Sequence, residues 1–438
     1  MNKPSRKHTM LSGAGLVIAN MIGVGVMVST GYMAQDMSAI PILLTWFVGT
    51  LIAICGVIAY SGVVVAVRES GGEYKFLSEL VHPFLGYIAG WGSLVLGFSA
   101  AIAVDGLAIG SFLRTLGQDV EPRLIGSVVI IAITILHAFD NNLSHRSQNL
   151  LVVFKLSFLV AFVLLALTWG NNALPQWSAP NQVEGFPWSK MIENQFWIAF
   201  AFSGWNAAVY AAGEFRDPGR DVPRAMMTGI IVVAILYLAI NWVFVANLTP
   251  ADAIAVVNYE ETRITLAHLI ALDIFGQHGA KLVSILVILA FVSAISAMMM
   301  IGPRVYAAMA EDGYLPSMFK LRDGKPPFYA TFLQAAVSLL FLYSHTLREA
   351  VLAASGFLML FSALTAASLF KLSFGQYQPR PSRLHLGASA LFIAAIAVIL
   401  FSALKTASVQ WYAFGAVLVL ATLTYLLTLH LKRTRVSI

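Results

Sequence analysis

Two interruptions inside long apolar segments of this sequence have the composition of a binding site. The first, Gly23-Val24-Gly25, lies inside residues 11–35, and the second, Ser203-Gly204-Trp205-Asn206, lies inside residues 190–212. Glycine costs about 1 kcal/mol relative to alanine inside a helix, so each interruption weakens a helix. An unwound turn frees backbone N–H groups, which bind a carboxylate, and carbonyl groups, which accept hydrogen bonds from an ammonium group. The pair of interruptions therefore predicts a site for a zwitterion.

A simpler interpretation is open for each interruption. Paired glycines also let two helices pack closely, as in GxxxG contacts. Phe200, Phe202 and Trp205, at the second interruption, are of the type that packs between membrane helices or lies at the membrane interface. However, the two interruptions lie five spans apart, in corresponding positions of two halves. This placement favours a matched pair of broken helices over packing alone.

The composition requires an apolar environment for most of the chain. Of the 438 residues, 59% are hydrophobic and 11% are charged, whereas soluble domains carry about a quarter charged residues. In a bilayer every backbone amide must be satisfied within its segment, which leaves helices or closed barrels. The apolar blocks run for roughly twenty residues, as membrane-spanning helices do. We therefore predict an all-α membrane protein, whose first apolar stretch is a retained span because it exceeds the length of a signal-peptide core.

Twelve membrane spans are predicted. They lie near residues 11–35, 41–66, 84–113, 124–140, 148–170, 190–212, 225–248, 279–303, 329–345, 348–371, 385–404 and 409–431. With the N-terminus inside, nineteen of the 27 Lys and Arg residues fall in cytoplasmic segments, seven fall in outer segments, and Lys155 remains within the fifth span. This charge bias predicts that both tails, residues 1–10 and 432–438, lie on the cytoplasmic side of the cell (inner) membrane.

Four ordered segments between about residues 13 and 330 resemble one known family. They are residues 22–26 (Ile-Gly-Val-Gly-Val), 71–91 (Gly-Gly-Glu-Tyr to Gly-Trp), 200–225 (Phe-Ala-Phe-Ser-Gly-Trp-Asn to Pro-Arg-Ala) and 304–316 (Arg-Val-Tyr to Gly-Tyr-Leu-Pro). Together they resemble the amino acid–polyamine–organocation superfamily of permeases, in the branch that contains the light chains of heteromeric amino-acid transporters and their bacterial relatives. Each segment is weak evidence alone, and the ordered set is specific.

The resemblance implies a fold of twelve helices arranged as a 5+5 inverted repeat. The first repeat would be residues 11–170 and the second residues 190–371, joined by an extracytoplasmic loop at residues 171–189. The first and sixth helices would be broken, and two peripheral helices would follow at residues 385–431. Transport would proceed by alternating access.

The resemblance also assigns the residues that would hold an amino-acid substrate. Gly23, Val24 and Gly25 would offer their amides to its carboxylate. Val24 stands where the family usually has a small polar residue, so a hydroxyl contact to the carboxylate is missing. The carbonyl groups of Ile22, Phe202 and Ser203 would accept hydrogen bonds from the substrate ammonium group. The aromatic gate over the site would be Phe200, and the residues beside the pocket would be Gly204, Trp205 and Asn206.

Two ionisable side chains are predicted at membrane depth, where a charge is costly and marks a functional candidate. Lys155 matches a lysine of sodium-independent family members. By resemblance its ammonium group would replace a sodium ion and bridge the broken first span to the eighth near Ser293 and Ser296. The alternative for Lys155 is snorkelling to the inner headgroups. Asp105, in the third span, could protonate during transport or attract a cationic side chain, and a polar contact between helices or a hydrated helix flank is an equal alternative.

A charged cluster follows the sixth span. It consists of Glu214, Arg216, Arg220 and Arg224, together with an aspartate at position 217. Alternating access needs an inner gate, which ion pairs within this cluster would provide. Short charged loops are also commonly just solvated, so both interpretations stay open.

Motifs for several other functions are missing from the sequence. There is no Gly-Lys-Ser/Thr phosphate loop for ATP, no His-Glu-x-x-His spacing for a metal, and no catalytic nucleophile with a base. His137 is expected at the membrane interface. The basic residues are scattered rather than clustered as for nucleic acid, and the single Cys55 forms no disulfide within the chain. We predict no cofactor, no metal and no enzymatic activity.

The expected function is secondary transport or exchange of amino acids without sodium. A neutral substrate is expected because Asn206 stands where some amine-handling relatives place a glutamate. The alternatives are a transporter of cationic amino acids or polyamines, and a membrane sensor that binds an amino acid without moving it. The direction of transport, proton coupling and the oligomeric state are left open by the sequence.

Overall fold

The structure, a computed structural model, is all-helical in the part of the chain that it describes. The described residues are 9–139, 141–173, 177–181, 184–321, 326–374, 380–406 and 411–436, and no strand occurs among them. Most of the predicted N-terminal tail, residues 1–8, and the last two residues of the predicted C-terminal tail lie outside these ranges.

A helix lies at each range where a span was expected. The helical segments at these ranges are α1 (Met10–Met21), α2 (Val24–Met33), α3 (Ala39–Ala66), α5 (Pro83–Gly92), the π-helix η1 (Ser93–Ser99), α6 (Ala100–Arg114), α7 (Pro122–Phe139), α8 (Asn141–Trp169), α10 (Gln195–Phe202), α11 (Ala207–Tyr210), α12 (Pro218–Asn247), α15 (Leu266–Ile301), α17 (Phe328–Ser344), α18 (Leu347–Phe374), α19 (Arg383–Thr406) and α20 (Trp411–Val436). Shorter helices connect them: α4 (Glu73–Leu80), α9 (Trp188–Glu193), α13 (Pro250–Asn258), α14 (Glu260–Ile264) and α16 (Pro303–Glu311).

The length and hydropathy of these helices identify the chain as a multi-pass membrane protein. Within the described residues, nine segments are long and apolar enough to cross a bilayer, and two shorter apolar helices, Phe328–Ser344 and Phe414–His430, accompany them. The expected span at residues 190–212 is not among them because it is interrupted, and its longer piece, α10, has only 8 residues. The count of twelve spans therefore stays a prediction.

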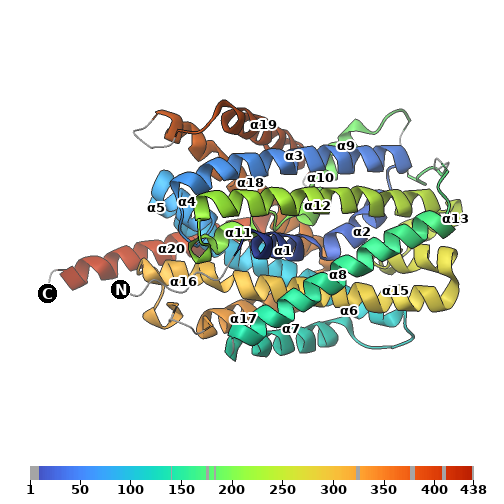
Figure 1. Cartoon of the computed structure of the whole chain (residues 1–438), viewed down its shortest axis with the longest axis horizontal. Coiled ribbons are helices and arrows are strands. Elements are labelled where there is room, and N and C mark those ends of the chain that lie inside the picture. The colour runs from blue at the N-terminus through green and yellow to red at the C-terminus, as the bar shows by residue number, and fades with distance from the viewer. Residues whose placement is uncertain are drawn as a thin grey trace.

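The helices pack in two groups. In the first group, α12 lies against α1 and α3, and α10 lies against α2 and α3. In the second group, α6, α7, α15 and α17 contact one another. Figure 1 shows the broken pair α1 and α2 near the middle of the molecule, below α3 and α12. The interruptions therefore lie where the two groups meet, and the inverted repeat itself stays a prediction.

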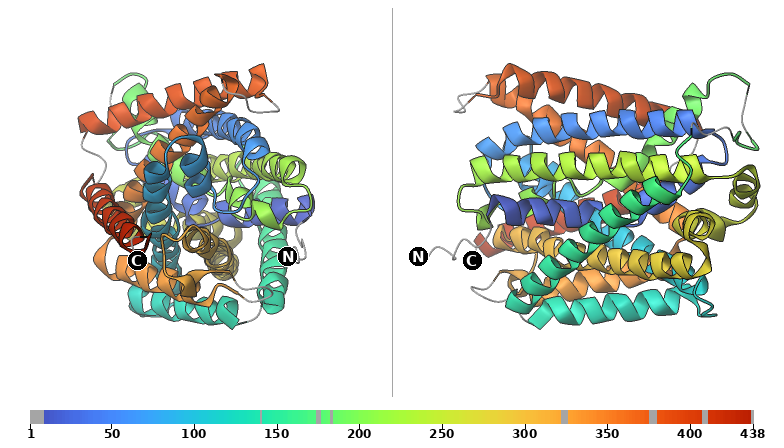
Figure 2. Two further views of the ribbon diagram at one scale, coloured as in Figure 1. Left: turned by 90° about the vertical axis from the view of Figure 1, so that its left-hand side faces the viewer. Right: turned by 45° about the vertical axis from the view of Figure 1, so that its right-hand side comes forward.

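The C-terminal helices lie outside this core. Helix α19 packs on α3 and α18, and α20 packs on α5. The start of α1 and the end of α20 lie at the same end of the molecule (Figure 2).

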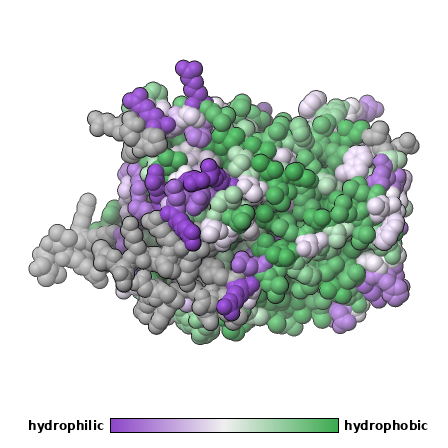
Figure 3. All heavy atoms as spheres, viewed as in Figure 1, coloured by the Kyte–Doolittle hydropathy of each residue, from purple (hydrophilic) through white to green (hydrophobic). Residues whose placement is uncertain are grey.

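On the face drawn in Figure 3, the coloured atoms are mainly apolar over the middle, and polar residues gather toward both ends. Several helices carry exposed leucines, among them Leu164, Leu340, Leu391 and Leu423. Large exposed apolar surfaces are rare on soluble monomers. Hydrocarbon is the environment that such a surface fits.

One helical feature was not predicted from the sequence. The third span changes from α to π geometry at Ser93–Ser99 and returns to α at Ala100. A π-turn adds a residue to the turn and occurs often at functional sites. In this protein it brings Gly97 and Phe98 to the wall of a central pocket.

The topology can be tested with single cysteines in a Cys55→Ser background. Gln118 is exposed in the loop after α6, and Met318 is exposed after α16. The predicted spans place these two loops on opposite sides of the membrane. A membrane-impermeant maleimide should therefore label Gln118→Cys in intact cells, and Met318→Cys only after the membrane is opened. Labelling of both cysteines in intact cells would contradict the span count.

Candidate functional site

The first broken helix unwinds at Ile22 and Gly23. Helix α1 ends at Met21, and α2 begins at Val24 with Gly23 as its extended N-cap residue. The break thus lies one residue earlier than Gly23-Val24-Gly25, because Val24 and Gly25 already belong to the first turn of α2. Gly23 lies close to Asp105, since a Cβ atom at position 23 would be 3.1 Å from Oδ1 of Asp105 and would require a small shift of that side chain.

Lys155 neutralises the carbonyl end of α1. Its ammonium group is fully buried and donates hydrogen bonds to the carbonyl oxygens of Ala19, at 3.1 Å, and Ile22, at 2.5 Å. A cation is favoured at this end of a helix because the last carbonyl groups carry partial negative charge. Snorkelling to the headgroups, the alternative for this residue, does not fit its full burial.

The expected bridge from Lys155 to Ser293 and Ser296 is not present among the described hydrogen bonds. The Ser296 hydroxyl instead donates to Gln148, at 2.6 Å, and lies 2.7 Å from Nε2 of His137. The hydroxyl of Ser293 is buried and has no hydrogen-bond partner in the described part of the chain. His137 is only 3% exposed, so its ring faces other helices rather than solvent, and its expected depth at the membrane interface stays a prediction. A position near the end of an apolar run does not reveal that a ring faces another helix.

Asp105 neutralises the amide end of α2. Its Oδ1 atom accepts a hydrogen bond of 2.9 Å from the backbone N–H of Val24, and the side chain is 2% exposed. A carboxylate is stabilised at a helix N-terminus by the partial positive charge of the free N–H groups. The amide of Val24, which was expected to bind a substrate carboxylate, is therefore already bound by the chain itself. Among the alternatives for Asp105, the structure shows a polar contact between helices.

The second broken helix unwinds from Ser203 to Asn206, as predicted. Helix α10 ends at Phe202 and α11 begins at Ala207. Gly204 has φ +96°, which favours glycine, and a Cβ atom there would lie 2.8 Å from Cβ of Asn20. The two breaks therefore touch each other, with Gly204 against the last turn of α1.

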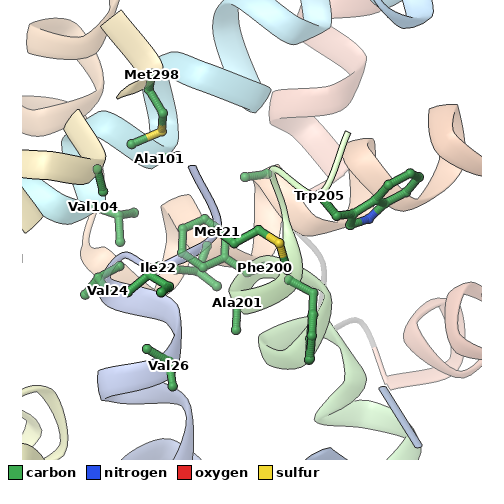
Figure 4. Close-up of a cluster of buried hydrophobic side chains, with 14 of the residues drawn as sticks. Met21, Ile22, Val24, Val26, Ala101, Val104, Phe200, Ala201, Trp205 and Met298 are labelled. Atoms are coloured by element: carbon green, nitrogen blue, oxygen red, sulfur yellow. The ribbon is translucent and has the colours of Figure 1, made fainter. Parts of the chain in front are cut away.

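A tyrosine that the sequence did not single out joins the two breaks. The hydroxyl of Tyr237, on α12, lies 2.6 Å from the carbonyl oxygen of Met21 and 2.9 Å from that of Ala201, and its single proton can be donated to either. These carbonyl groups belong to the last turns of α1 and α10. Figure 4 shows Met21 close to Phe200, and Ile22 and Val24 on the side of Val104. Nothing in the sequence distinguishes Tyr237 from other aromatic residues of its apolar span.

Two pockets flank the second break. The smaller has an empty volume of 390 Å³ and is lined by Asn20, Gly97, Phe98, Ala101, Ser203, Gly204, Asn206, Ala207, Tyr210, Met298 and Leu358. The larger, of 580 Å³, lies toward α3, α18 and α19 and shares Ser203, Gly204 and Asn206 with the smaller. We call the smaller one the central pocket, because it touches both broken helices and η1.

The predicted substrate residues divide between these pockets. Phe202 and Trp205 line only the larger pocket. The remaining five predicted residues line neither of the two pockets: Ile22, Gly23, Val24, Gly25 and Phe200. The second break thus supplies the walls of the central pocket, and from the first break only its neighbour Asn20 contributes.

A buried glutamate lies directly behind the central pocket. Glu73, at the start of α4, is 4% exposed. It accepts hydrogen bonds from Nδ2 of Asn206, at 2.5 Å, from the hydroxyl of Tyr210, at 2.5 Å, and from the hydroxyl of Tyr60, at 2.9 Å. The Gly-Gly-Glu-Tyr segment was noticed in the sequence, but its glutamate was not chosen as a site residue.

The predicted inner-gate residues differ in their surroundings. Glu214 forms an ion pair with Arg304, which is 7% exposed as a residue and also donates to the carbonyl group of Met300. This pair joins the end of the sixth expected span to the end of the eighth. Arg216, Arg220 and Arg224 are exposed to solvent. The ion pair of Glu214 thus reaches outside the predicted cluster, and the gate within the cluster stays a prediction.

A second set of polar contacts ties α4 to the segment after α16. Lys75 forms ion pairs with Asp312, at 2.9 Å, and Glu69, at 3.0 Å, and the hydroxyl of Tyr74 donates to Asp312 at 2.5 Å. Partial burial by itself would lower the pKa of Lys75, but its hydrogen bonds to Asp312 and Glu69 raise the pKa above its usual value. Lys75 thus keeps its charge at neutral pH, and the contacts hold α4 in place.

Comparison with known proteins agrees with this architecture. A sequence model described as amino acid permease matches residues 9–423. The chain belongs to the amino acid permease family. The resemblance to the amino acid–polyamine–organocation superfamily is thereby confirmed.

The relatives of this permease carry names of amino-acid transporters. It is 25% identical to the serine/threonine exchanger SteT of Bacillus subtilis over 345 residues, which cover 76% of this chain and 75% of that protein. It is 23% identical to the human large neutral amino acids transporter small subunit 2 over 71% of this chain and 59% of that protein. It is 25% identical to the mouse b(0,+)-type amino acid transporter 1 over 56% of this chain and 52% of that protein. The two mammalian proteins are thus matched over little more than half of their length.

The contact between the breaks gives a stability prediction. The variant Gly204→Ala should lower the unfolding free energy of the permease by about 1–3 kcal/mol, because alanine is strained at positive φ and its methyl group meets Asn20. A thermal unfolding series of the purified protein in detergent measures the change. Gly387→Ala is the matched control, since nothing lies within 4 Å of a Cβ atom there. Equal melting temperatures for the two variants would contradict the close packing of the breaks.

Proposed function

We propose that this permease is a secondary transporter that moves amino acids, or amines closely related to them, by alternating access. The observation that carries the proposal is the central pocket, where the second broken helix meets η1 and the last turn of α1. Discontinuous helices at mid-membrane are the usual construction of a transporter site. The names of the relatives support amino acids as the solute class, and a carrier rather than an enzyme.

The ammonium group of the solute is held by acceptors at the second break. The carbonyl groups of Phe202 and Ser203 belong to the unwound segment, where α10 ends. Phe200 and Trp205 complete the aromatic surroundings, and the gating role of Phe200 remains part of the proposal. A neutral side chain fits the lining of the central pocket, which contains no charged residue.

Transport proceeds without sodium in this proposal. Lys155 places a cation against the carbonyl groups of Ala19 and Ile22, where a sodium ion would otherwise be bound. Buried lysine and aspartate side chains change protonation readily, so Lys155 and Asp105 are the candidates for a coupled proton. The ion pair between Glu214 and Arg304 is the proposed inner gate, on the side where positive charge places the termini in the cytoplasm.

A sensor that binds an amino acid without moving it is the second candidate. Flux distinguishes the two. Proteoliposomes that contain the purified permease should accumulate a radiolabelled amino acid or amine by counterflow when the same solute is inside. Binding without counterflow, for every solute of a panel of neutral, cationic and acidic amino acids and their amines, would favour the sensor.

The role of Lys155 gives a prediction with a matched control. Lys155→Ala should reduce counterflow at least about a hundredfold, because it leaves two buried carbonyl groups at the break without a donor. Wild-type counterflow should be unchanged when external sodium is replaced by choline. Lys281→Ala, which changes an exposed lysine on α15, should transport normally. Unchanged flux of folded Lys155→Ala at every pH would overturn the role of this residue.

A further inference from the structure

The Gly-Gly-Glu segment at the start of α4 encloses one tyrosine of α11. The backbone N–H group of Gly71 donates to the carbonyl oxygen of Tyr210 at 3.2 Å, and the Tyr210 hydroxyl donates to Oε2 of Glu73 at 2.5 Å. Between these two contacts Gly72 has φ +58°, which favours glycine, and a Cβ atom there would lie 2.2 Å from Cε1 of Tyr210. Three consecutive residues thus contact the carbonyl group, the ring and the hydroxyl of Tyr210.

The carboxylate of Glu73 also binds the second break and α3. Its Oε1 atom accepts hydrogen bonds from Nδ2 of Asn206, at 2.5 Å, and from the hydroxyl of Tyr60, at 2.9 Å. Asn206 and Tyr210 both line the central pocket, whereas Glu73 does not. Glu73 therefore fastens one wall of the pocket to α4 and α3 from behind.

This wall lies on the side of the pocket that is expected to face the cytoplasm. Helix α11 follows the second break, and the chain continues from it to Glu214, whose ion pair with Arg304 is the proposed inner gate. A solute that leaves the central pocket toward this end has to pass α11. The attachment of α11 to α4 therefore bears on the inner path.

Every described partner of the Glu73 carboxylate is a neutral donor. The residue is 4% exposed, and in the described part of the chain no Lys, Arg or His side chain bonds to it. The titratable groups that face it are the hydroxyls of Tyr60 and Tyr210. A buried carboxylate is costly unless it is well bonded, so the charge of Glu73 depends on these neutral donors.

Charged side chains on the neighbouring elements are engaged elsewhere. Helices α3, α5 and α11 contain no charged residue, and those of α18, which also packs on α4, lie in its first and last turns. The remaining charged groups around α4 and α16 form ion pairs with one another: Lys75 with Glu69, Glu79 and Asp312, Arg304 with Glu214, and Lys320 with Glu311. Glu73 is thus separate from the charged network at the protein surface.

The three hydrogen bonds of Glu73 fit an ionised carboxylate. An ionised carboxylate only accepts, which suits three donors, and the free N–H groups at the start of α4 favour a negative charge there. A proton bound to Oε2 would meet the proton of the Tyr210 hydroxyl. The bonds at Oε1 would become neutral ones, which are about half as strong. Protonation therefore weakens the attachment of α11.

From these contacts we propose that Glu73 is a positioning residue, which holds α11 against α4 while its carboxylate is ionised. A proton taken up from cytoplasmic water releases α11 and opens the central pocket toward the cytoplasm. Glu73 acts through Asn206 and Tyr210 and touches no solute itself. This inference rests on the proposed function, alternating access, and adds a control of the inner path that is separate from Lys155 and Asp105.

A cysteine on α11 reports the opening. Ala207 lines the central pocket and is 1% exposed, so Ala207→Cys in a Cys55→Ser background should react slowly with a membrane-impermeant maleimide in inside-out vesicles. Glu73→Gln has the shape of a protonated glutamate. It should speed this reaction at least about tenfold, the effect of roughly one hydrogen bond to a charged group.

The pH profile of the same reaction tests the protonation. With Glu73 present, labelling of Ala207→Cys should rise as the pH is lowered, and with Glu73→Gln it should not depend on pH. Met318→Cys, which is exposed on the same expected side, corrects for the pH dependence of the thiol itself. A corrected profile that is flat with Glu73 present would overturn the inference.

Further variants separate positioning from a general loss of structure. Glu79→Gln changes an exposed glutamate of the same helix and should leave the labelling of Ala207→Cys unchanged. Glu73→Asp keeps a carboxylate and should keep the pH dependence. If Glu73→Gln does not fold, Tyr60→Phe removes one donor from Oε1 and should speed labelling at least about threefold. Equal labelling in the folded variants and in the parent protein would overturn the role of Glu73.

Counterflow in proteoliposomes distinguishes the failure of this inference from the failure of the proposed function. If amino acids exchange while labelling is indifferent to Glu73 and to pH, transport stands and the inference is wrong. If no solute exchanges while labelling follows Glu73 as expected, the positioning role stands and the transport function is wrong.

Discussion

A helix that breaks inside a bilayer must have its freed backbone groups satisfied by the protein itself, because hydrocarbon offers no hydrogen bonds. The structure meets this constraint with side chains from other helices. Lys155 binds carbonyl groups at the end of α1, Asp105 binds the first N–H group of α2, and Tyr237 binds carbonyl groups from both breaks. The position of each partner, and hence the packing of the helices that carry them, follows from this requirement.

The same constraint determines the chemistry left for a solute. Lys155 and Asp105 each oppose the partial charge of the helix end that they face, so the first break is neutralised within the chain. Side chains around the central pocket use their donors on carbonyl groups or on Glu73. The polar side chains that line the central pocket are thus bound first to the chain itself.

The pocket is linked by polar contacts to the end of the molecule where the chain termini lie. Glu73 binds Asn206 at the second break and begins helix α4. The next residues of that helix, Tyr74 and Lys75, bind Asp312 after α16. The second break is therefore joined to α4 by one buried carboxylate, that of Glu73. These contacts form a contiguous polar network from the second break to the segment after α16.

The sequence by itself determined the class of the protein, the sites of the helices and the second break, because apolar length, glycine and membrane-depth charge are local properties. It also singled out Lys155 and Asp105, since an ionisable residue in an apolar span is conspicuous wherever it points. It missed the π-turn, because a change of helical geometry leaves no mark on the composition, and it did not reveal that His137 is buried against other helices. Only the tertiary structure decided the partners: Asp105 meets an N–H group 81 residues away, and Tyr237 meets a carbonyl group 216 residues away. Hydrogen bonds between residues so far apart in the sequence depend on how the helices pack. The acceptor that each side-chain donor binds is therefore decided by the tertiary structure.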